Sequence, residues 1–180
     1  MRKEIIEKIE IPAGIEVETA VDELKFKKDG KEIIRRFSGC RISKEENFLV
    51  LECKKATKNE KKLLKTAKAH IINAIKGLEN KYVYKLQICA VHFPMSVTYD
   101  KTKRELIIKN YLGEVKPRIA KILPDTEVKV DKDIITVEGH DKEKTGQTAA
   151  NIEKSVKASN RDRRVFQDGI YLVSRNEEIR

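Results

Sequence analysis

Histidine and cysteine side chains are the ones most suited to metal binding or nucleophilic catalysis, and the chain has three of each. They stand at His70, His92, His140, Cys40, Cys53 and Cys89. No two histidines are four residues apart and no cysteines form a C-x-x-C pair, so the spacing of a zinc site is missing. No G-x-S-x-G, Walker A or G-x-G-x-x-G motif occurs. The carboxylates interleave with lysines as in a solvated face. We therefore expect no metal, no cofactor and no enzyme activity.

The charge balance points instead to binding. The 180 residues carry 39 lysines and arginines against 29 acids, a net charge of +10 and a pI near 9.4. Such a surface suits a polyanion, either nucleic acid or an anionic membrane. No run of 18 apolar residues exists, and the charged start at Met1 has no apolar segment behind it. We expect a cytoplasmic protein that binds nucleic acid and no membrane.

Two basic segments are candidates for that contact. Between Lys54 and Lys85 there are ten lysines and two glutamates, a pattern that a solvated helix face explains equally well. The second segment runs from Lys154 to Arg164, where five cations face one acid in a polar stretch: Lys154, Lys157, Arg161, Arg163 and Arg164. Arginine forks suit phosphate, so we predict that this segment is the main RNA contact. Gross charge favours the other half, because residues 1–85 carry +7 and residues 86–180 carry +3.

The secondary-structure elements that position these residues follow the same order in both halves of the chain, where the sequence predicts strands followed by a helix. In the first half, Asp29-Gly30 between two apolar runs predicts a hairpin, and Thr57-Lys-Asn-Glu60 predicts a capping box. Apolar residues at helical spacing follow: Leu63, Ala67, Ile71, Ala74, Ile75 and Leu78. After this helix, Tyr82–Phe93 is a long strand candidate. In the second half the expected strands are Met95–Tyr99, Glu105–Lys109, Val128–Val130, Asp133–Glu138 and Phe166–Val173. Between the last two, Asp141 is the expected N-cap of a helix.

Matching positions in the two halves are separated by the same number of residues. Leu51 and Val137 are 86 residues apart, and so are Leu63 and Ala149. This repeat favours a duplication over two unrelated small domains. Grouped strands before a helix are typical of α+β folds with antiparallel sheets. We expect two tandem similar domains, residues 1–85 and 86–180, each an antiparallel sheet packed with a helix, with the second as the RNA-binding domain.

The second half also resembles a known family. Gln147-Thr-Ala-Ala-Asn-Ile152 and Phe166-Gln-Asp-Gly-Ile-Tyr171 resemble the sixth protein of the large ribosomal subunit in its archaeal form, and Ala69–Gly77 and His92-Phe-Pro-Met95 also match. The likeness covers nearly the whole chain. It implies a structural protein without catalysis, bound to large-subunit ribosomal RNA near the sarcin–ricin loop and the factor-binding region, beside neighbouring ribosomal proteins and translation factors.

By position, the resemblance implies RNA contacts by Lys142, Lys144 and Gln147 at the start of the second helix and by the Lys154–Arg164 segment. It implies a structural role for Asp168-Gly169. Two alternatives remain open at this point. One is an RNA-binding ribosome assembly factor of the same fold, and the other is an enzyme acting on a phosphorylated substrate, for which the sequence offers no site.

Overall fold

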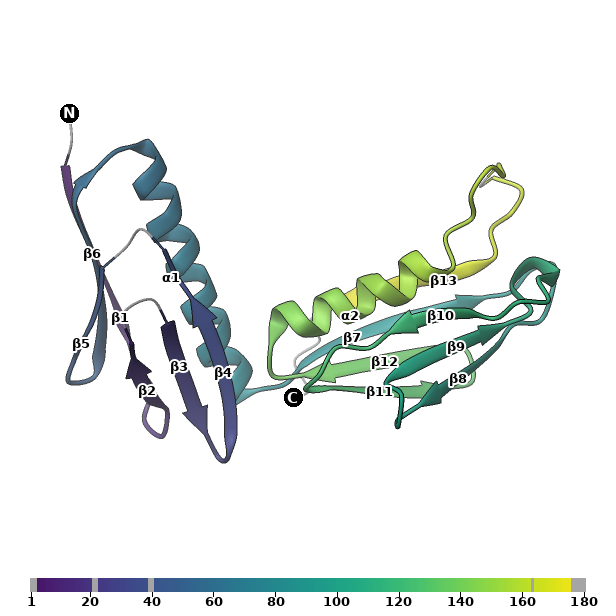
Figure 1. Ribbon diagram of the computed structural model, residues 1–180, viewed down its shortest axis with the longest axis horizontal. Helices are drawn as coiled ribbons and strands as arrows, with labels where there is room; N and C mark the ends of the chain where they lie inside the picture. The colour runs from purple at the N-terminus through teal and green to yellow at the C-terminus, as the bar shows by residue number, and fades with distance from the viewer. Residues whose placement is uncertain (1–2, 21–22, 39–40, 163, 176–180) are drawn as a thin grey trace. The chain divides into compact units, whose positions relative to one another are not determined.

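The computed structural model describes residues 3–20, 23–38, 41–162 and 164–175. It divides into two compact units, Met1–Glu79 and Asn80–Arg180 (Figure 1). Within the described residues, each unit has two antiparallel sheets and one α-helix. The predicted α+β class with repeated sheet and helix units is therefore confirmed. In each unit the helix packs against strands of both sheets.

The first unit comprises β1 (Lys3–Glu10), β2 (Glu16–Thr19), β3 (Glu23–Lys28), β4 (Lys31–Arg36), β5 (Arg41–Glu45), β6 (Phe48–Ala56) and α1 (Lys58–Glu79). Its sheets have the strand orders β1-β6-β5 and β2-β3-β4. The helix α1 packs against strands of both sheets. Phe26, Leu49, Leu64 and Ile71 are fully buried between these layers.

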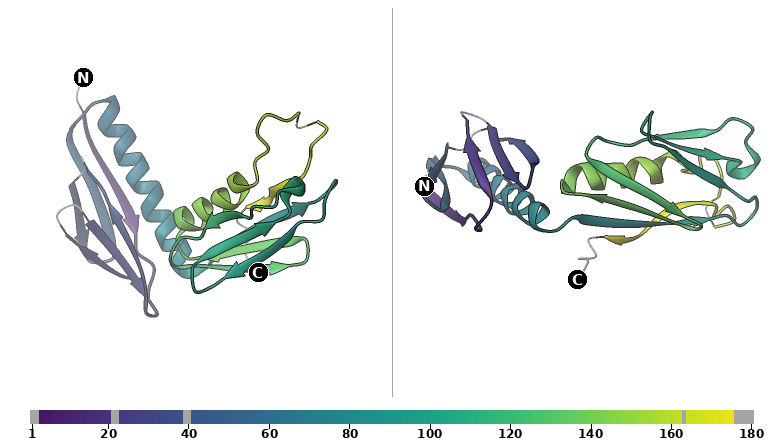
Figure 2. Two further views of the ribbon diagram at one scale, coloured as in Figure 1. Left: turned by 45° about the vertical axis from the view of Figure 1, so that its right-hand side comes forward. Right: turned by 90° about the horizontal axis from the view of Figure 1, so that it is seen from below.

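The second unit comprises β7 (Tyr82–Cys89), β8 (Ser96–Asp100), β9 (Glu105–Lys109), a 3-10 turn (Tyr111–Gly113), β10 (Arg118–Lys121), β11 (Thr126–Asp131), β12 (Ile134–Gly139), α2 (Lys142–Ser155) and β13 (Gly169–Arg175). Its sheets have the orders β11-β12-β7-β13 and β10-β9-β8. The helix α2 contacts β7, β12 and β13 of one sheet and β10 of the other. In both views of Figure 2 each helix lies against the strands of its own unit.

The two units have corresponding strand orders, which shows that the sheet and helix arrangement is repeated. In the first unit β6 lies between β1 and β5, and in the second β12 lies between β7 and β11. The three-stranded sheets β2-β3-β4 and β8-β9-β10 also correspond. The offset of 86 residues holds at strand level, since β6 begins at Phe48 and β12 at Ile134. The second unit differs by adding β13 to the outer edge of β7.

The division between the units falls after Glu79, six residues before the boundary expected at residues 85 and 86. The reason is that Tyr82–Cys89 is one strand, and its partners β12 and β13 both belong to the second unit. A boundary inside β7 would cut its hydrogen-bonded ladder.

The hairpin and the capping box that the sequence predicts in the first unit are both present. Asp29 and Gly30 both have positive φ, 48° and 74°, which a tight hairpin between β3 and β4 requires. Thr57 and Glu60 form the capping box, because the Thr57 N–H donates to Glu60 Oε2 at 2.9 Å. The buried stripe of α1 passes through Leu64, whereas Leu63 is 47% exposed. The expectation that Leu63 faces the core was therefore wrong by one residue.

Candidate nucleic-acid interface

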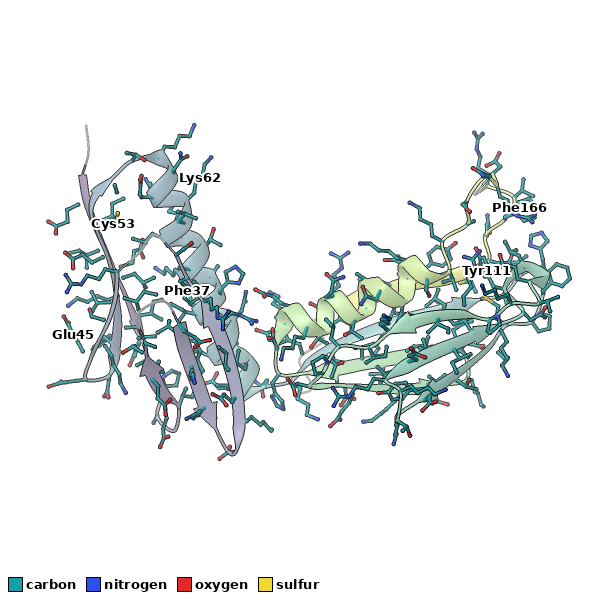
Figure 3. The ribbon with its side chains drawn as sticks, in the orientation of Figure 1. Phe37, Glu45, Cys53, Lys62, Tyr111 and Phe166 are labelled. Carbon is teal, nitrogen blue, oxygen red and sulfur yellow. The ribbon has the colours of Figure 1, made fainter. Side chains whose placement is uncertain are left out.

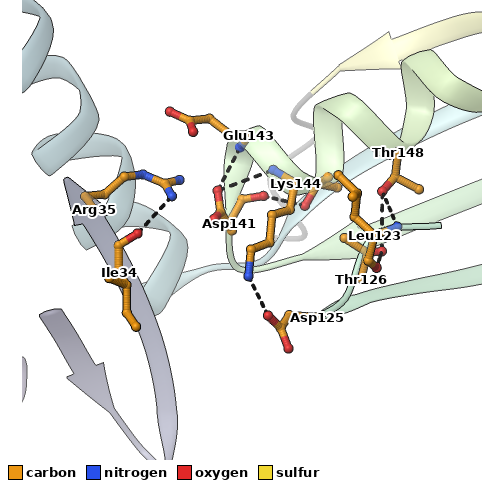
Figure 4. Close-up of polar contacts among 10 residues, drawn as sticks. Ile34, Arg35, Leu123, Asp125, Thr126, Asp141, Glu143, Lys144 and Thr148 are labelled. Carbon is orange, nitrogen blue, oxygen red and sulfur yellow. Dashed lines mark hydrogen bonds and ion pairs between the residues drawn. The ribbon is translucent and has the colours of Figure 1, made fainter. Parts of the chain in front are cut away.

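The start of α2 is fixed by its cap (Figure 4). Asp141 is almost wholly buried, and its side chain accepts from the N–H groups of Glu143 at 2.9 Å and Lys144 at 3.4 Å. This confirms the expected N-cap. One turn later, the Thr145 hydroxyl donates to the Asp141 carbonyl at 2.7 Å. The direction of α2 across the sheets is thus set at its first residues.

The three residues expected to bind RNA at this end have different surroundings. Lys144 forms an ion pair with Asp125 at 2.6 Å, as Figure 4 shows. The Lys142 ammonium lies 5.7 Å from the centre of the Tyr82 ring. Gln147 is exposed and its amide donates to Asn151 Oδ1 at 2.8 Å. Lys144 would have to give up an acidic partner in order to contact phosphate.

The helix separates these residues from the basic segment. A helix rises about 1.5 Å per residue, so Lys142 and Lys154 are roughly 18 Å apart along α2. Gln147, Asn151 and Lys154 follow one another at four- and three-residue spacing and therefore share a face. The seven predicted contacts that the structure describes therefore form two groups toward opposite ends of α2, with Gln147 on the exposed helix face between them.

The second group lies at the end of α2 and on the segment that leads from it to β13; residues 154–168 are called here the basic loop. Arg118, in β10, holds its beginning. One guanidinium nitrogen of Arg118 donates to the carbonyls of Ser155 at 3.1 Å and Lys157 at 3.3 Å. The other nitrogens bind both carboxylate oxygens of Glu114, at 2.8 and 2.6 Å. These hydrogen bonds lower the pKa of Glu114 and raise that of Arg118.

The basic loop ends at Asp168, whose carboxylate is buried. Asp168 Oδ1 accepts from the N–H groups of Val91 at 2.8 Å and His92 at 2.9 Å, and Oδ2 lies 2.5 Å from His92 Nδ1. Burial alone would raise the Asp168 pKa, but the hydrogen bonds from His92 and Val91 outweigh it and the pKa is lowered. The carboxylate therefore ties the loop to the segment that follows β7. This gives Asp168 a structural role, as the resemblance implied.

Aromatic stacking joins these two segments at the same place. The rings of His92 and Phe166 are stacked, with centroids 5.3 Å apart. The Arg161 guanidinium carbon lies 4.8 Å from the centre of the Phe166 ring. Figure 3 labels Phe166 and Tyr111 at this end of the second unit. Arg161 is thus an exposed cation whose side chain has a fixed support.

A turn in the loop positions Arg164. Asp162 Oδ1 accepts from the Arg164 N–H at 2.9 Å, and the Asp162 carbonyl accepts from the Phe166 N–H at 2.9 Å. The Arg164 side chain is 92% exposed and lies 3.6 Å from the Asp162 carboxylate. Arg163, the remaining predicted contact of the loop, lies outside the described residues. Arg161 and Arg164 are therefore presented to solvent by an ordered turn.

Lys154 and Lys157 are exposed and line one cavity of about 280 Å³ together with Phe166 and Tyr171. The structure thus gathers Lys154, Lys157, Arg161 and Arg164 around the basic loop and leaves Lys142 and Lys144 at the far end of α2. Sequence reasoning missed the residues that hold the loop, which are Arg118, His92 and Phe166. Their partners are distant in the chain, so no local pattern could have singled them out.

The described ranges contain no group of three or more histidine, cysteine or acidic side chains able to hold a metal ion. Within the same ranges, no helix combines the length and the apolar character needed to span a membrane.

Comparison with known proteins identifies the family. A model of ribosomal protein L6 matches residues 93–169, within the second unit. The large ribosomal subunit protein uL6 of Methanococcus vannielii is 42% identical over 177 residues, covering 97% of this chain and 96% of that protein. This chain belongs to the ribosomal protein L6 family. Two further L6 relatives agree: the uL6 proteins of Staphylothermus marinus, 44% identical over 97% of this chain and 96% of that protein, and of Methanobrevibacter smithii, 42% identical over 95% and 96%.

Membership in the L6 family confirms the resemblance that was seen in Gln147–Ile152 and Phe166–Tyr171. The relatives come from archaea, as the resemblance to the archaeal form implied. It also confirms that the chain is not an enzyme, since the family is one of structural ribosomal components.

Proposed function

We propose that this protein is a structural constituent of the large ribosomal subunit and binds large-subunit ribosomal RNA through the basic loop. The observation that carries this proposal is likeness over almost the full length of the chain to proteins named as large ribosomal subunit proteins. The basic loop supplies the chemistry, because its four described cations are exposed and its two ends are fixed.

The proposed mechanism is phosphate clamping. Lys154, Lys157, Arg161 and Arg164 contact backbone phosphates, which position a protein on RNA without reading sequence. Ordering a long side chain on binding costs up to about 1.5–2 kcal/mol. Arg161 already lies on Phe166, and the loop backbone is held by Arg118 and Asp168. The loop is therefore partly ordered in the free protein, and less conformational entropy is lost when RNA binds.

The start of α2 has a lesser part in this proposal. Gln147 shares the exposed face with Lys154 and extends the contact along the helix. Lys144 exchanges Asp125 for a phosphate, and Lys142 shifts away from Tyr82. Each exchange loses an existing interaction, so we expect smaller contributions from these two lysines than from the loop.

The place of the contact follows from the resemblance. We propose a position near the sarcin–ricin loop and the factor-binding region of the cytoplasmic ribosome, beside other ribosomal proteins and close to docked translation factors. The second unit, residues 80–180, is the RNA-binding domain in this proposal, because the basic loop and α2 both belong to it.

The test is sedimentation of ribosomal particles from cells of a related archaeon that express the tagged full chain. A constituent of the large subunit stays with mature particles after a high-salt wash. An assembly factor of the same fold is found on precursor particles only, or is released by the wash. Release would overturn the proposal and favour that alternative.

A further inference from the structure

The cavity beside the basic loop has the composition of a nucleotide site. Its volume is about 280 Å³ and it lies between the end of α2, the first residues of the loop and β13. Val156 and Ile170 contribute apolar surface, and Tyr171 contributes an aromatic ring that is 39% exposed. Pockets for drug-sized ligands span about 300–1,000 Å³, so this one suits a single small planar group.

The walls of the cavity are held in place. Arg118 hydrogen-bonds the carbonyls of Ser155 and Lys157, which fixes the backbone where α2 passes into the loop. The Tyr171 hydroxyl donates to the Gln167 carbonyl at 3.1 Å. The Tyr171 ring also lies against Gly169, where an added Cβ would come within 3.1 Å of it. The ring therefore has one supported position.

The charges around the cavity suit a nucleotide. Lys154 and Lys157 line it and are exposed, so they can reach a phosphate while a base occupies the interior. Phe166 is already engaged by His92 and Arg161, which leaves Tyr171 as the aromatic surface for a base. Single-stranded RNA is recognised by such stacking of an unpaired base on an aromatic ring.

Glu153 is the acidic residue that lines the cavity. It is exposed, and within the described residues its carboxylate makes no hydrogen bond or ion pair. A carboxylate only accepts hydrogen bonds. Guanine presents two adjacent donors on its Watson–Crick edge, N1–H and N2–H. Adenine, cytosine and uracil each place an acceptor beside their donor, which a carboxylate repels.

We propose that this cavity receives one unpaired guanine of the ribosomal RNA, stacked on Tyr171, hydrogen-bonded by Glu153 and flanked by Lys154 and Lys157 on the adjoining phosphate. This inference rests on the proposed function, since it names the nucleotide that the basic loop captures. It adds a base-specific contact to a surface that otherwise binds only the RNA backbone.

The experiment binds the full chain to protein-free large-subunit ribosomal RNA of a related archaeon. Kethoxal reports the Watson–Crick edge of unpaired guanines, and hydroxyl radicals report the sugar–phosphate backbone. The variants are Glu153→Gln and Tyr171→Ala. The matched control for Glu153→Gln is Glu143→Gln, on the exposed first turn of the same helix. Circular dichroism establishes that each variant is folded.

The wild type and the Glu143→Gln control should protect one guanine from kethoxal, and Tyr171→Ala should lose this protection because the stacking surface is removed. Glu153→Gln should restore its reactivity to the level of free RNA, weaken binding by about tenfold and leave the backbone footprint in place. A backbone footprint without a protected guanine, or protection that survives Glu153→Gln, overturns the guanine site and leaves the proposed function standing. Absence of any footprint overturns both. Because Glu153 is exposed, this outcome does not depend on whether Tyr171→Ala folds.

Discussion

Replacing Asp168 with Asn tests whether one buried carboxylate anchors the basic loop. The variant is nearly isosteric, so the cavity is filled and the amide oxygen still accepts from the N–H groups of Val91 and His92. What disappears is the negative charge on three short contacts, at 2.8, 2.9 and 2.5 Å. Hydrogen bonds to charged groups contribute about 1.5–3 kcal/mol and neutral ones about 0.5–1.5. A loss near 1 kcal/mol per contact gives about 3 kcal/mol in all.

The free energy of unfolding of the second unit should fall by that amount at pH 7. In a domain of this size each kcal/mol shifts Tm by about 4–8 °C, so its thermal transition should move down by roughly 12–24 °C. The assay is thermal unfolding of the full chain followed by NMR signals assigned to each unit. The first unit serves as the internal control, because its own transition should not move.

The pH dependence provides the sharper test. The folded-state pKa of Asp168 lies below its ordinary value of 3.8. The stabilisation is therefore complete above the unfolded-state pKa and is lost as pH falls through the folded-state pKa. The difference in stability between wild type and Asp168→Asn should be constant from pH 7 to about 5 and shrink below about pH 4. A difference that stays the same down to pH 3 would refute the role given to the charge.

Three further predictions concern the fold and the interface. Gly139→Ala should destabilise the second unit by about 1–3 kcal/mol, measured by urea unfolding, because an added Cβ would collide with the Thr145 hydroxyl; an unchanged midpoint would contradict this packing. Arg118→Lys should keep the unit folded but loosen the basic loop, since lysine cannot bridge Glu114 and two carbonyls at once; unchanged amide-exchange protection for residues 156–162 would count against the clamp. RNA affinity should fall with salt at a log–log slope of about −4 for five phosphate contacts, and a flat titration would exclude phosphate clamping.

Much of the fold could be predicted because its signals are local. The hairpin at Asp29-Gly30, the capping box at Thr57 and the N-cap at Asp141 each depend on a few adjacent residues, and all three form. The repeat was visible because Leu51 and Val137 are equivalent buried positions on equivalent strands.

Elements without a local signature were missed. The strands β1, β5 and β10 carry too few buried side chains to stand out; in β10 only Ala120 is buried. The strand β1 pairs with β6, which is distant in the chain, whereas β5 and β10 lie at sheet edges and pair with the strands next to them in sequence, β6 and β9. The expected strand Phe166–Val173 begins instead at Gly169, because Phe166 is held by the distant His92.

In the candidate site, too, some features could be predicted from the sequence and others could not. Arginine enrichment in the Lys154–Arg164 segment was visible in the sequence, and the structure presents Arg161 and Arg164 to solvent. The anchors of the loop were not visible, because Asp168 and His92 are 76 residues apart. The ion pair of Lys144 with Asp125 was hidden for the same reason.

We propose that the basic loop, and not the lysine-rich helix α1, is the principal RNA contact. The most direct measurement compares the affinity of the full chain for large-subunit ribosomal RNA after two sets of charge reversals. One set is Arg161→Glu with Arg164→Glu. The other is Lys61→Glu, Lys62→Glu and Lys65→Glu, three exposed residues of α1. The arginine pair should cost several kcal/mol, at about 1.5–3 per charge-assisted contact, and the lysine triple should cost less although it reverses more charge. A larger loss from the lysine triple would place the principal contact on the first unit and contradict the account.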